Sequence, residues 1–235
     1  MFYRKDIRTD LNFFEINFRF SNLLIGFEKI FIDKIKFQRK IAEKLENTYE
    51  LIENFIEKNP DFRSSLVPLN LRSEIHFIGE MIEESKKAAV GPMAAVAGAF
   101  ADELLLEAEK LAENIFIENG GDIALSINRS TRIMIFSGNK LFENKIGIEL
   151  PSGKFGIASS SGKIGHSLSF GIADVVTVIS SSATKSDAFA TSIANKIKDN
   201  CKPEKLLEEF SFLDGIMIIW GGKLWYKGKF EIFVI

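Results

Sequence analysis

Cysteine and histidine are nearly absent from this 235-residue sequence, which contains one cysteine, Cys201, and two histidines, His76 and His166. A disulfide framework needs at least two cysteines, and a structural zinc site needs several cysteine or histidine ligands. The sequence therefore excludes both within one chain, and any bound metal should be a hard cation held by oxygen atoms. A lone thiol is also typical of a reducing compartment, so we expect a cytoplasmic protein.

A basic excess and long apolar runs are also missing. The net charge of -2 and the pI of about 5.9 lack the positive charge that binding to a phosphate backbone needs. The longest uncharged run, residues 88–101, is shorter than the roughly 20 residues of a membrane span. The N-terminus is charged from its fourth residue and has no apolar signal-peptide core. We therefore expect no nucleic-acid partner and no membrane.

Proline is scarce as well, with 5 in the chain, whereas 46% of the residues are hydrophobic. No Pro/Ser-rich linker and no internal repeat interrupts the sequence. This composition favours a packed core along the whole length, and we expect a single domain covering residues 1–235.

The order of the hydrophobic patterns predicts the fold class. Residues 2–28 read as two or three antiparallel strands, and residues 30–58 have helical spacing. Helices are expected at about 72–87 and 92–113, then five or six strands between 114 and 181, a helix at 184–200, a short helix after Pro203 and a hairpin turned at Gly221 and Gly222. Helices early and strands mostly later favour an α+β fold of mainly antiparallel sheet packed with helices.

The stretch IENGGDIAL, residues 117–125, places Asn119, Gly120, Gly121 and Asp122 between two apolar strands. Asn-Gly in that setting is a strong hairpin signal. The second glycine and the following carboxylate are more than a two-residue turn requires, and adjacent glycines let main-chain N–H groups approach an anion closely. Both interpretations stay open, a plain turn or a phosphate-binding loop.

A second candidate site lies in SATKSDAFATSIANKI, where Ser182 to Ser186 supply the small polar residues of a helix start. We expect Asp187 in the first turn. Asp187 and Thr191 are four residues apart and therefore share one helix face, where a carboxylate and a hydroxyl can bind one hard cation. The alternative is an aspartate favoured by the helix dipole and a threonine bonded to its own helix.

Residues 162–171, GKIGHSLSFG, are too polar for a core strand and resemble a site loop. His166 is a candidate general base or phosphate contact, because imidazole titrates near neutral pH. Ser167 and Ser169 are candidates for contacts to the same ligand. The alternative is a loop histidine bonded to a main-chain carbonyl. His76, on a predicted helix, is expected to be structural.

The Ala- and Gly-rich residues 90–103 predict a helix that lies very close to a neighbouring element. The alternative is that Gly91 and Pro92 open a helix whose free N–H groups offer an anion site.

Four ordered motifs resemble uncharacterised protein family 0280 (UPF0280), a group of ApbE-like proteins, and the likeness extends over nearly the whole chain. They are AAVGPMAAVAGAFADE, ENGGDIAL, GHSLSFGIADVVTVIS and SDAFATSIAN. The more distant ApbE-like flavin transferases move FMN from FAD to a Thr or Ser hydroxyl with the help of Mg²⁺. Their N-x-GGD-I segment resembles residues 119–123, and their A-D-A-x-x-T-A metal motif is similar to residues 186–192.

The resemblance implies that Asp187 and Thr191 hold Mg²⁺ against the pyrophosphate of FAD or a related nucleotide, while Gly120 and Gly121 let the nucleotide approach. The transferases also carry H-x-x-D-P-x-T-G before VTVI, where this sequence reads GHSLSFG, with the histidine but without Asp-Pro or Thr-Gly. Several functions therefore stay open: an FMN transferase, an FAD pyrophosphatase, a non-catalytic nucleotide- or flavin-binding module, or a structural homo-oligomer without ligand.

Overall fold

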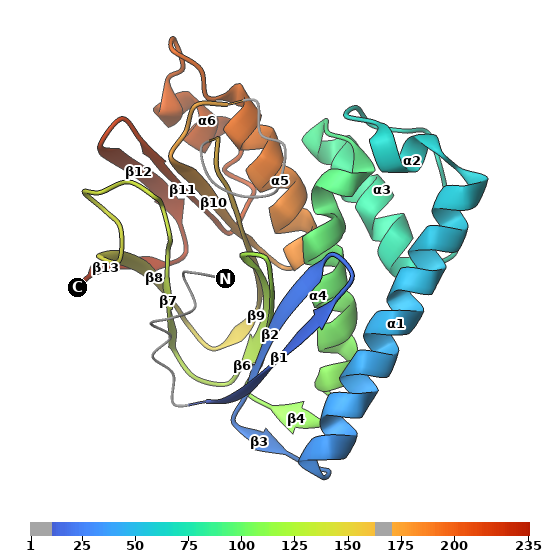
Figure 1. Ribbon diagram of the computed structural model, residues 1–235. Helices are drawn as coiled ribbons and strands as arrows, with labels where there is room; N and C mark the ends of the chain where they lie inside the picture. Colours follow the sequence, from blue (N-terminus) through green and yellow to red (C-terminus); the bar gives the residue numbers. More distant parts are fainter. Residues whose placement is uncertain (1–10, 163–170) are drawn as a thin grey trace.

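The computed structural model of the protein describes residues 11–162 and 171–235, and its largest element is an eight-stranded sheet (Figure 1). In spatial order its strands are β1 (Asn12–Phe18), β2 (Ser21–Phe27), β5 (Ile115–Asn119), β6 (Asp122–Ile127), β9 (Gly153–Ser160), β10 (Val175–Ser180), β11 (Gly215–Trp220) and β12 (Lys223–Gly228). Every neighbouring pair is antiparallel. Together with the helices, this sheet confirms the α+β class and the mainly antiparallel pairing that the sequence predicts.

Two smaller sheets take the remaining strands. One contains β13 (Glu231–Val234), β8 (Ile146–Leu150) and β7 (Thr131–Met134), and the other pairs β3 (Lys29–Ile30) with β4 (Ala112–Glu113). The predicted closing hairpin is present as β11 and β12, turned at Gly221 and Gly222, which both have positive φ. The last strand does not extend that hairpin, because β13 pairs with β8 in the small sheet.

The helices differ from the sequence prediction mainly at their ends. They are α1 (Lys34–Lys58), α2 (Asp61–Ser64), α3 (His76–Ala88), the 3-10 turn η2 (Pro92–Ala95), α4 (Val96–Ala108), α5 (Ala183–Lys196) and α6 (Pro203–Glu209). The helix expected from Arg72 begins only at His76, since Ile75 is extended. The helix expected to reach Glu113 ends at Ala108, because residues 112–113 give their backbone hydrogen bonds to β3.

The large sheet separates two apolar cores. Figure 1 shows α1, α3, α4 and α5 grouped on one side of this sheet and β7, β8 and β13 on the other. Side chains alternate between these faces along each strand. On β10, Val176 and Val178 belong to the core under the helices, whereas Val175 and Ile179 belong to the core under the small sheet. The sheet is therefore covered on both faces, and polar side chains can be buried only where they find partners or border a cavity.

Small residues let the helices approach each other and the sheet very closely. A Cβ atom added to Gly98 of α4 would lie 2.2 Å from the carbonyl oxygen of Ala183, the first residue of α5. A Cβ atom added to Gly156 of β9 would lie 1.9 Å from the carbonyl carbon of Ser182. The close-packing interpretation of the Ala- and Gly-rich segment is confirmed at Gly98. The start of α5 is thus pressed between α4 and β9.

Within residues 11–162 and 171–235, no single helix is long and apolar enough to cross a membrane. One bent pair, residues 76–88 and 92–108 with an angle of 107° between them, meets the requirement by length and composition only when the two are taken together.

Candidate functional site

A cavity of about 2570 Å³ passes around the turn between β5 and β6. One part is bordered by the β1–β2 tip, α1 and α4, and the other lies between β6 and the small sheet. Of the site residues predicted from the sequence, six line this cavity: Asn119, Gly120, Gly121, Asp122, Asp187 and Thr191. His166, Ser167 and Ser169 lie outside the described residues. Ligand sites commonly occupy roughly 300–1,000 Å³, so one small ligand would fill part of the cavity.

The Asn-Gly-Gly-Asp segment is a two-residue hairpin turn. Asn119 pairs with Asp122, and the two glycines between them have φ of 69° and 110°, the positive values that type I′ turns require. The Nδ2 of Asn119 donates to the carbonyl oxygen of Ala97, 3.2 Å away, which fastens the turn to α4. A Cβ atom at Gly121 would meet nothing within 4 Å. The turn interpretation is correct, and the same turn presents bare backbone to the cavity.

Glu118, which precedes the turn, is a buried carboxylate that no local sequence pattern indicates. Its Oε1 accepts a hydrogen bond of 2.6 Å from the backbone N–H of Gly121. This amide is therefore already engaged, and it is not a free donor for a phosphate. A glutamate in the strand IFIEN looks like a solvent-facing residue, and only the packing of β5 between β2 and β6 shows that it is covered.

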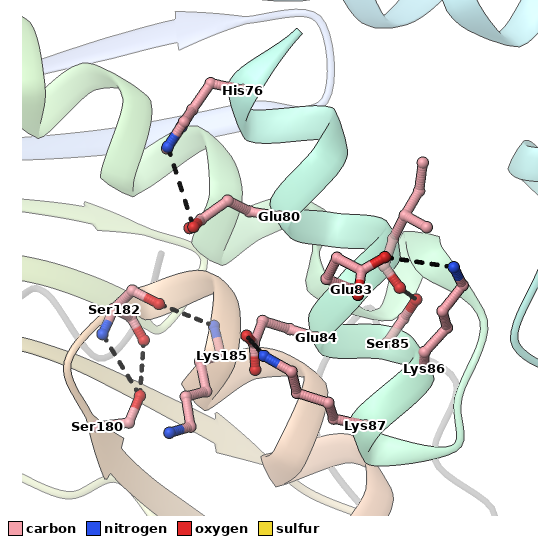
Figure 2. Close-up of polar contacts among 11 residues, drawn as sticks. His76, Glu80, Glu83, Glu84, Ser85, Lys86, Lys87, Ser180, Ser182 and Lys185 are labelled. Atoms are coloured by element: carbon pink, nitrogen blue, oxygen red, sulfur yellow. Dashed lines mark hydrogen bonds and ion pairs between the residues drawn. The ribbon is translucent and has the colours of Figure 1, made fainter. Parts of the chain in front are cut away.

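Asp187 lies one turn deeper in its helix than predicted. Helix α5 begins at Ala183 after the N-cap Ser182, whose Oγ accepts a hydrogen bond of 3.2 Å from the N–H of Lys185 (Figure 2). Asp187 is consequently the fifth helical residue, and the first turn contains no acidic side chain. The interpretation of a first-turn aspartate favoured by the helix dipole is therefore wrong. Thr191, one turn further, lines the same cavity, as the four-residue spacing predicts.

The Asp187 side chain is half-buried against α4. Its Oδ2 accepts a hydrogen bond of 3.0 Å from the backbone N–H of Gly98. Burial raises the pKa of Asp187 from its ordinary value to about 7, although hydrogen bonds from the amides of Gly98 and Ala97 act in the opposite direction. The nearby carboxylate of Asp102 adds to the increase.

Asp122, at the end of the turn, is a buried carboxylate that lines the cavity, as Glu118 is. Burial raises its pKa well above the ordinary value, and the negative charges of Asp187 and Glu118 raise it further, while a hydrogen bond from the backbone of Ser159 opposes the shift. Among the described groups that act on the carboxylates of Asp122 and Asp187 there is no lysine or arginine. The two side chains come from different elements, β6 and α5, and concentrate negative potential at one place.

A further carboxylate, that of the half-buried Asp102 of α4, has a structural role. It accepts hydrogen bonds from the N–H of Ala183 at 2.9 Å and from the N–H and Oγ1 of Thr184 at 2.8 and 2.6 Å. These are the free amides of the first turn of α5, and a carboxylate there also complements the helix dipole. Asp102 is not among the cavity-lining residues. No local sequence pattern indicates this role, because Asp102 and Ala183 are 81 residues apart.

The donors available to a metal are few. Among the residues that the structure describes, no group of three or more His, Cys, Asp or Glu side chains is placed to hold a metal ion. His76 does not contribute, because it lies at the start of α3 with its side chain 74% exposed and its Nε2 4.0 Å from Glu80 (Figure 2). It is thus a surface residue on a helix that lies away from the cavity lining. Oxygen donors at the cavity include Asp122, Asp187 and Thr191.

Comparison with known sequences agrees with the motifs. Residues 5–213 match the model of a protein family described as AbpE bacteria. A UPF0280 protein of Methanocaldococcus jannaschii is 36% identical over 208 residues, which cover 84% of this chain and 84% of that protein. A UPF0280 protein of Methanobrevibacter smithii is 46% identical over 156 residues, which cover 64% of this chain and 65% of that protein.

Solved structures with a similar fold include an ApbE protein of Thermotoga maritima, with a TM-score of 0.55 at 15% sequence identity, covering 94% of this chain and 96% of that chain. The flavin transferase ApbE from Vibrio cholerae has a TM-score of 0.55 at 12% identity, covering 96% and 97%. At these identities the likeness concerns the fold.

Proposed function

Because this chain belongs to the UPF0280 family of ApbE-like proteins, we propose that it binds FAD or a related nucleotide through the diphosphate, together with Mg²⁺. The fold that it shares with flavin transferases supports a flavin or an adenine nucleotide as the ligand class. The proposed site comprises Asn119, Gly120, Gly121, Asp122, Asp187 and Thr191, which line one cavity.

The observation that carries this proposal is the pairing of Asp122 with Asp187. The buried carboxylate of Asp122 and the half-buried carboxylate of Asp187 repel each other and lose hydration, so the unliganded site favours a proton on one of them. A divalent cation relieves both costs. A bare diphosphate beside these groups would be repelled, and the Gly121 amide in the turn is already engaged by Glu118. The chemistry of the site therefore requires a cation if a phosphate is to bind there.

The donor set fits Mg²⁺. This ion usually keeps several waters and is held by one or two carboxylates plus substrate phosphates, without a cage made only of protein atoms. Asp187 and Thr191 on one face of α5 would hold it, and Asp122 lies across from them on β6. The lack of a three-ligand cluster among the described residues agrees with a metal that shares its coordination with a nucleotide.

If the protein is an enzyme, the reaction is attack by a hydroxyl or by water on the diphosphate, giving FMN transfer or FAD hydrolysis. Mg²⁺ would supply neutralisation of the charge on the diphosphate. The open backbone at Gly121 leaves space for the nucleotide. His166 is the candidate base, with Ser167 and Ser169 as candidate ligand contacts, and all three lie outside the described residues.

The second candidate function is a non-catalytic nucleotide- or flavin-binding module. The sequence GHSLSFG, which lacks the Asp-Pro and Thr-Gly of the transferases, favours it. Both functions need the same cavity and the same cation. We also propose, from the sequence, a cytoplasmic location and a single domain; strands from both ends of the chain in one large sheet support the latter.

A thermal-shift panel separates these functions. Metal-stripped protein is melted with FAD, FMN, ATP and ADP, each with and without Mg²⁺. A ligand bound only by the native state stabilises it by about 2.7 kcal/mol at one hundred times its dissociation constant. An Mg²⁺-dependent shift with FAD supports the site, and release of FMN or AMP over time identifies an enzyme. No shift with any nucleotide would overturn the proposal.

A further inference from the structure

Ser160, the last residue of β9, has a buried hydroxyl that makes no hydrogen bond within the fold. The residue is 4% exposed and lines the cavity. Its Oγ has no hydrogen-bond partner, a condition that it shares among the described residues only with Glu84 Oε2. Buried hydroxyl groups are almost always paired, so an unpaired one at a cavity wall indicates a missing ligand atom.

The serines on either side of Ser160 do have partners. Ser159 Oγ lies 2.9 Å from Thr177 Oγ1, and Ser161 also takes part in an interaction. The three consecutive serines therefore differ, and of the three only Ser160 has a buried Oγ without a hydrogen-bond partner. Because successive side chains of a strand point to opposite faces, Ser160 points to the face opposite that of Ser159.

The face of Ser160 is the one covered by α5. Ser160 points to the same face of the sheet as Ala158 and Gly156. At Gly156 the start of α5 touches the strand. Helix α5 follows β10 and packs on both β9 and β10. Since β10 is antiparallel to β9, a helix that turns back along β10 runs in the same direction as β9.

The rise of the two elements places Ser160 at the level of the proposed metal ligands. Four residues of strand, from Gly156 to Ser160, span about 13 Å at roughly 3.3 Å per residue. A helix covers that distance in about nine residues at roughly 1.5 Å each. Counted from Ser182, which touches Gly156, nine residues lead to Thr191.

We propose that the Ser160 hydroxyl binds the diphosphate of the nucleotide, donating a hydrogen bond to a phosphate oxygen beside the cation held by Asp187 and Thr191. This inference rests on the proposed nucleotide function and adds a ligand contact to it. Rotation about the Cα–Cβ bond changes the direction in which the hydroxyl points.

The test compares Ser160→Ala with the wild-type protein in calorimetric titrations with ADP in excess Mg²⁺. Losing one hydrogen bond to a charged oxygen weakens binding by about tenfold or more. The melting temperature of the unliganded Ser160→Ala protein should stay equal or rise, because the hydroxyl that is removed makes no hydrogen bond in the unliganded protein. Unchanged affinity for ADP would overturn the inference, as would a clear fall in unliganded stability.

Ser180→Ala is the matched control. Ser180 is a buried serine on the neighbouring strand β10, but it donates to the carbonyl oxygen of Ser182 at 2.9 Å and is absent from the cavity lining (Figure 2). Its replacement should lower the melting temperature and leave ADP affinity unchanged. If the wild-type protein itself binds neither ADP nor FAD with Mg²⁺, the proposed function fails. If it binds both and Ser160→Ala binds equally well, only the Ser160 inference fails.

Discussion

The Oδ2 of Asp187 lies 3.0 Å from the backbone nitrogen of Gly98, which donates a hydrogen bond from α4 to the side chain of α5. This contact is possible because Gly98 has no side chain, since a Cβ atom there would lie 2.2 Å from the carbonyl oxygen of Ala183. The close approach of the two helices and the orientation of the carboxylate toward the cavity therefore depend on the same glycine.

Replacing Gly98 by alanine should separate α4 from α5. Overpacking of this kind costs about 1–3 kcal/mol, and the carboxylate of Asp187 would lose its amide partner. We expect a lower urea midpoint and weaker Mg²⁺-dependent nucleotide binding. Gly79→Ala in α3 is the matched control, because its Cβ would meet only the Ser73 carbonyl oxygen at 3.2 Å. Equal stability of both variants would contradict the close-packing account.

The raised pKa of Asp187 predicts a pH-dependent stability. The folded state binds a proton on this group up to about pH 7, whereas the unfolded state releases it near the ordinary value of 3.8. The unliganded protein should therefore lose stability as pH rises from about 4 to about 7. Asp187→Asn should melt several degrees higher than the wild type at pH 8 and have a shallower pH profile. A lower melting temperature at pH 8 would refute this.

Replacing Asp102 should change the stability of the protein in the direction opposite to that of replacing Asp187. Burial also raises the pKa of Asp102, but the carboxylate receives three hydrogen bonds from the start of α5. Asp102→Ala leaves those donors unpaired and should destabilise the protein by about 2–3 kcal/mol, measured by urea unfolding. Asp102→Asn keeps one acceptor and should lose less. A neutral Asp102→Ala would show that the contact does not support α5.

Proton competition predicts how metal affinity depends on pH. Mg²⁺ needs the ionised carboxylate of Asp187, whose pKa is about 7 in the unliganded protein. The apparent affinity for Mg²⁺ in the presence of ADP should rise from pH 6 to about pH 8 and then level off. Calorimetry in buffers of different ionisation enthalpy should detect proton release at pH 6.5. An affinity that does not change across this range would contradict a site at Asp187.

Much of the fold follows from local sequence patterns. The six strands between residues 114 and 181 either alternate apolar and polar residues or are apolar throughout, and they end at Gly, Asn or Ser turns. Each is found as a strand, β5 to β10. The turn at Gly120 and Gly121 was predictable because positive φ at both positions favours glycine. Helix ends were less predictable, since tertiary pairing of residues 112–113 with β3 overrides their helical propensity.

The cavity was only partly predictable. Asp187 and Thr191 could be paired from their spacing, and the turn residues from their glycines, but no pattern shows that the two segments face one cavity. The roles of Glu118 and Asp102 were not predictable from the sequence. Burial of Glu118 depends on packing of β5 between its neighbouring strands, and the partner of Asp102 lies 81 residues away. That the Ser160 hydroxyl has no hydrogen-bond partner can be recognised only from the three-dimensional structure around it.

The most direct test of the central claim, an Mg²⁺-dependent nucleotide site at Asp187, is the melting temperature with FAD. Metal-stripped wild type and Asp187→Asn are each melted at pH 8 with and without FAD, in Mg²⁺ and in EDTA. We predict a rise for wild type with FAD in Mg²⁺ alone, and none for Asp187→Asn in any condition. The same FAD-dependent rise in both proteins, or none in the wild type, would contradict the claim.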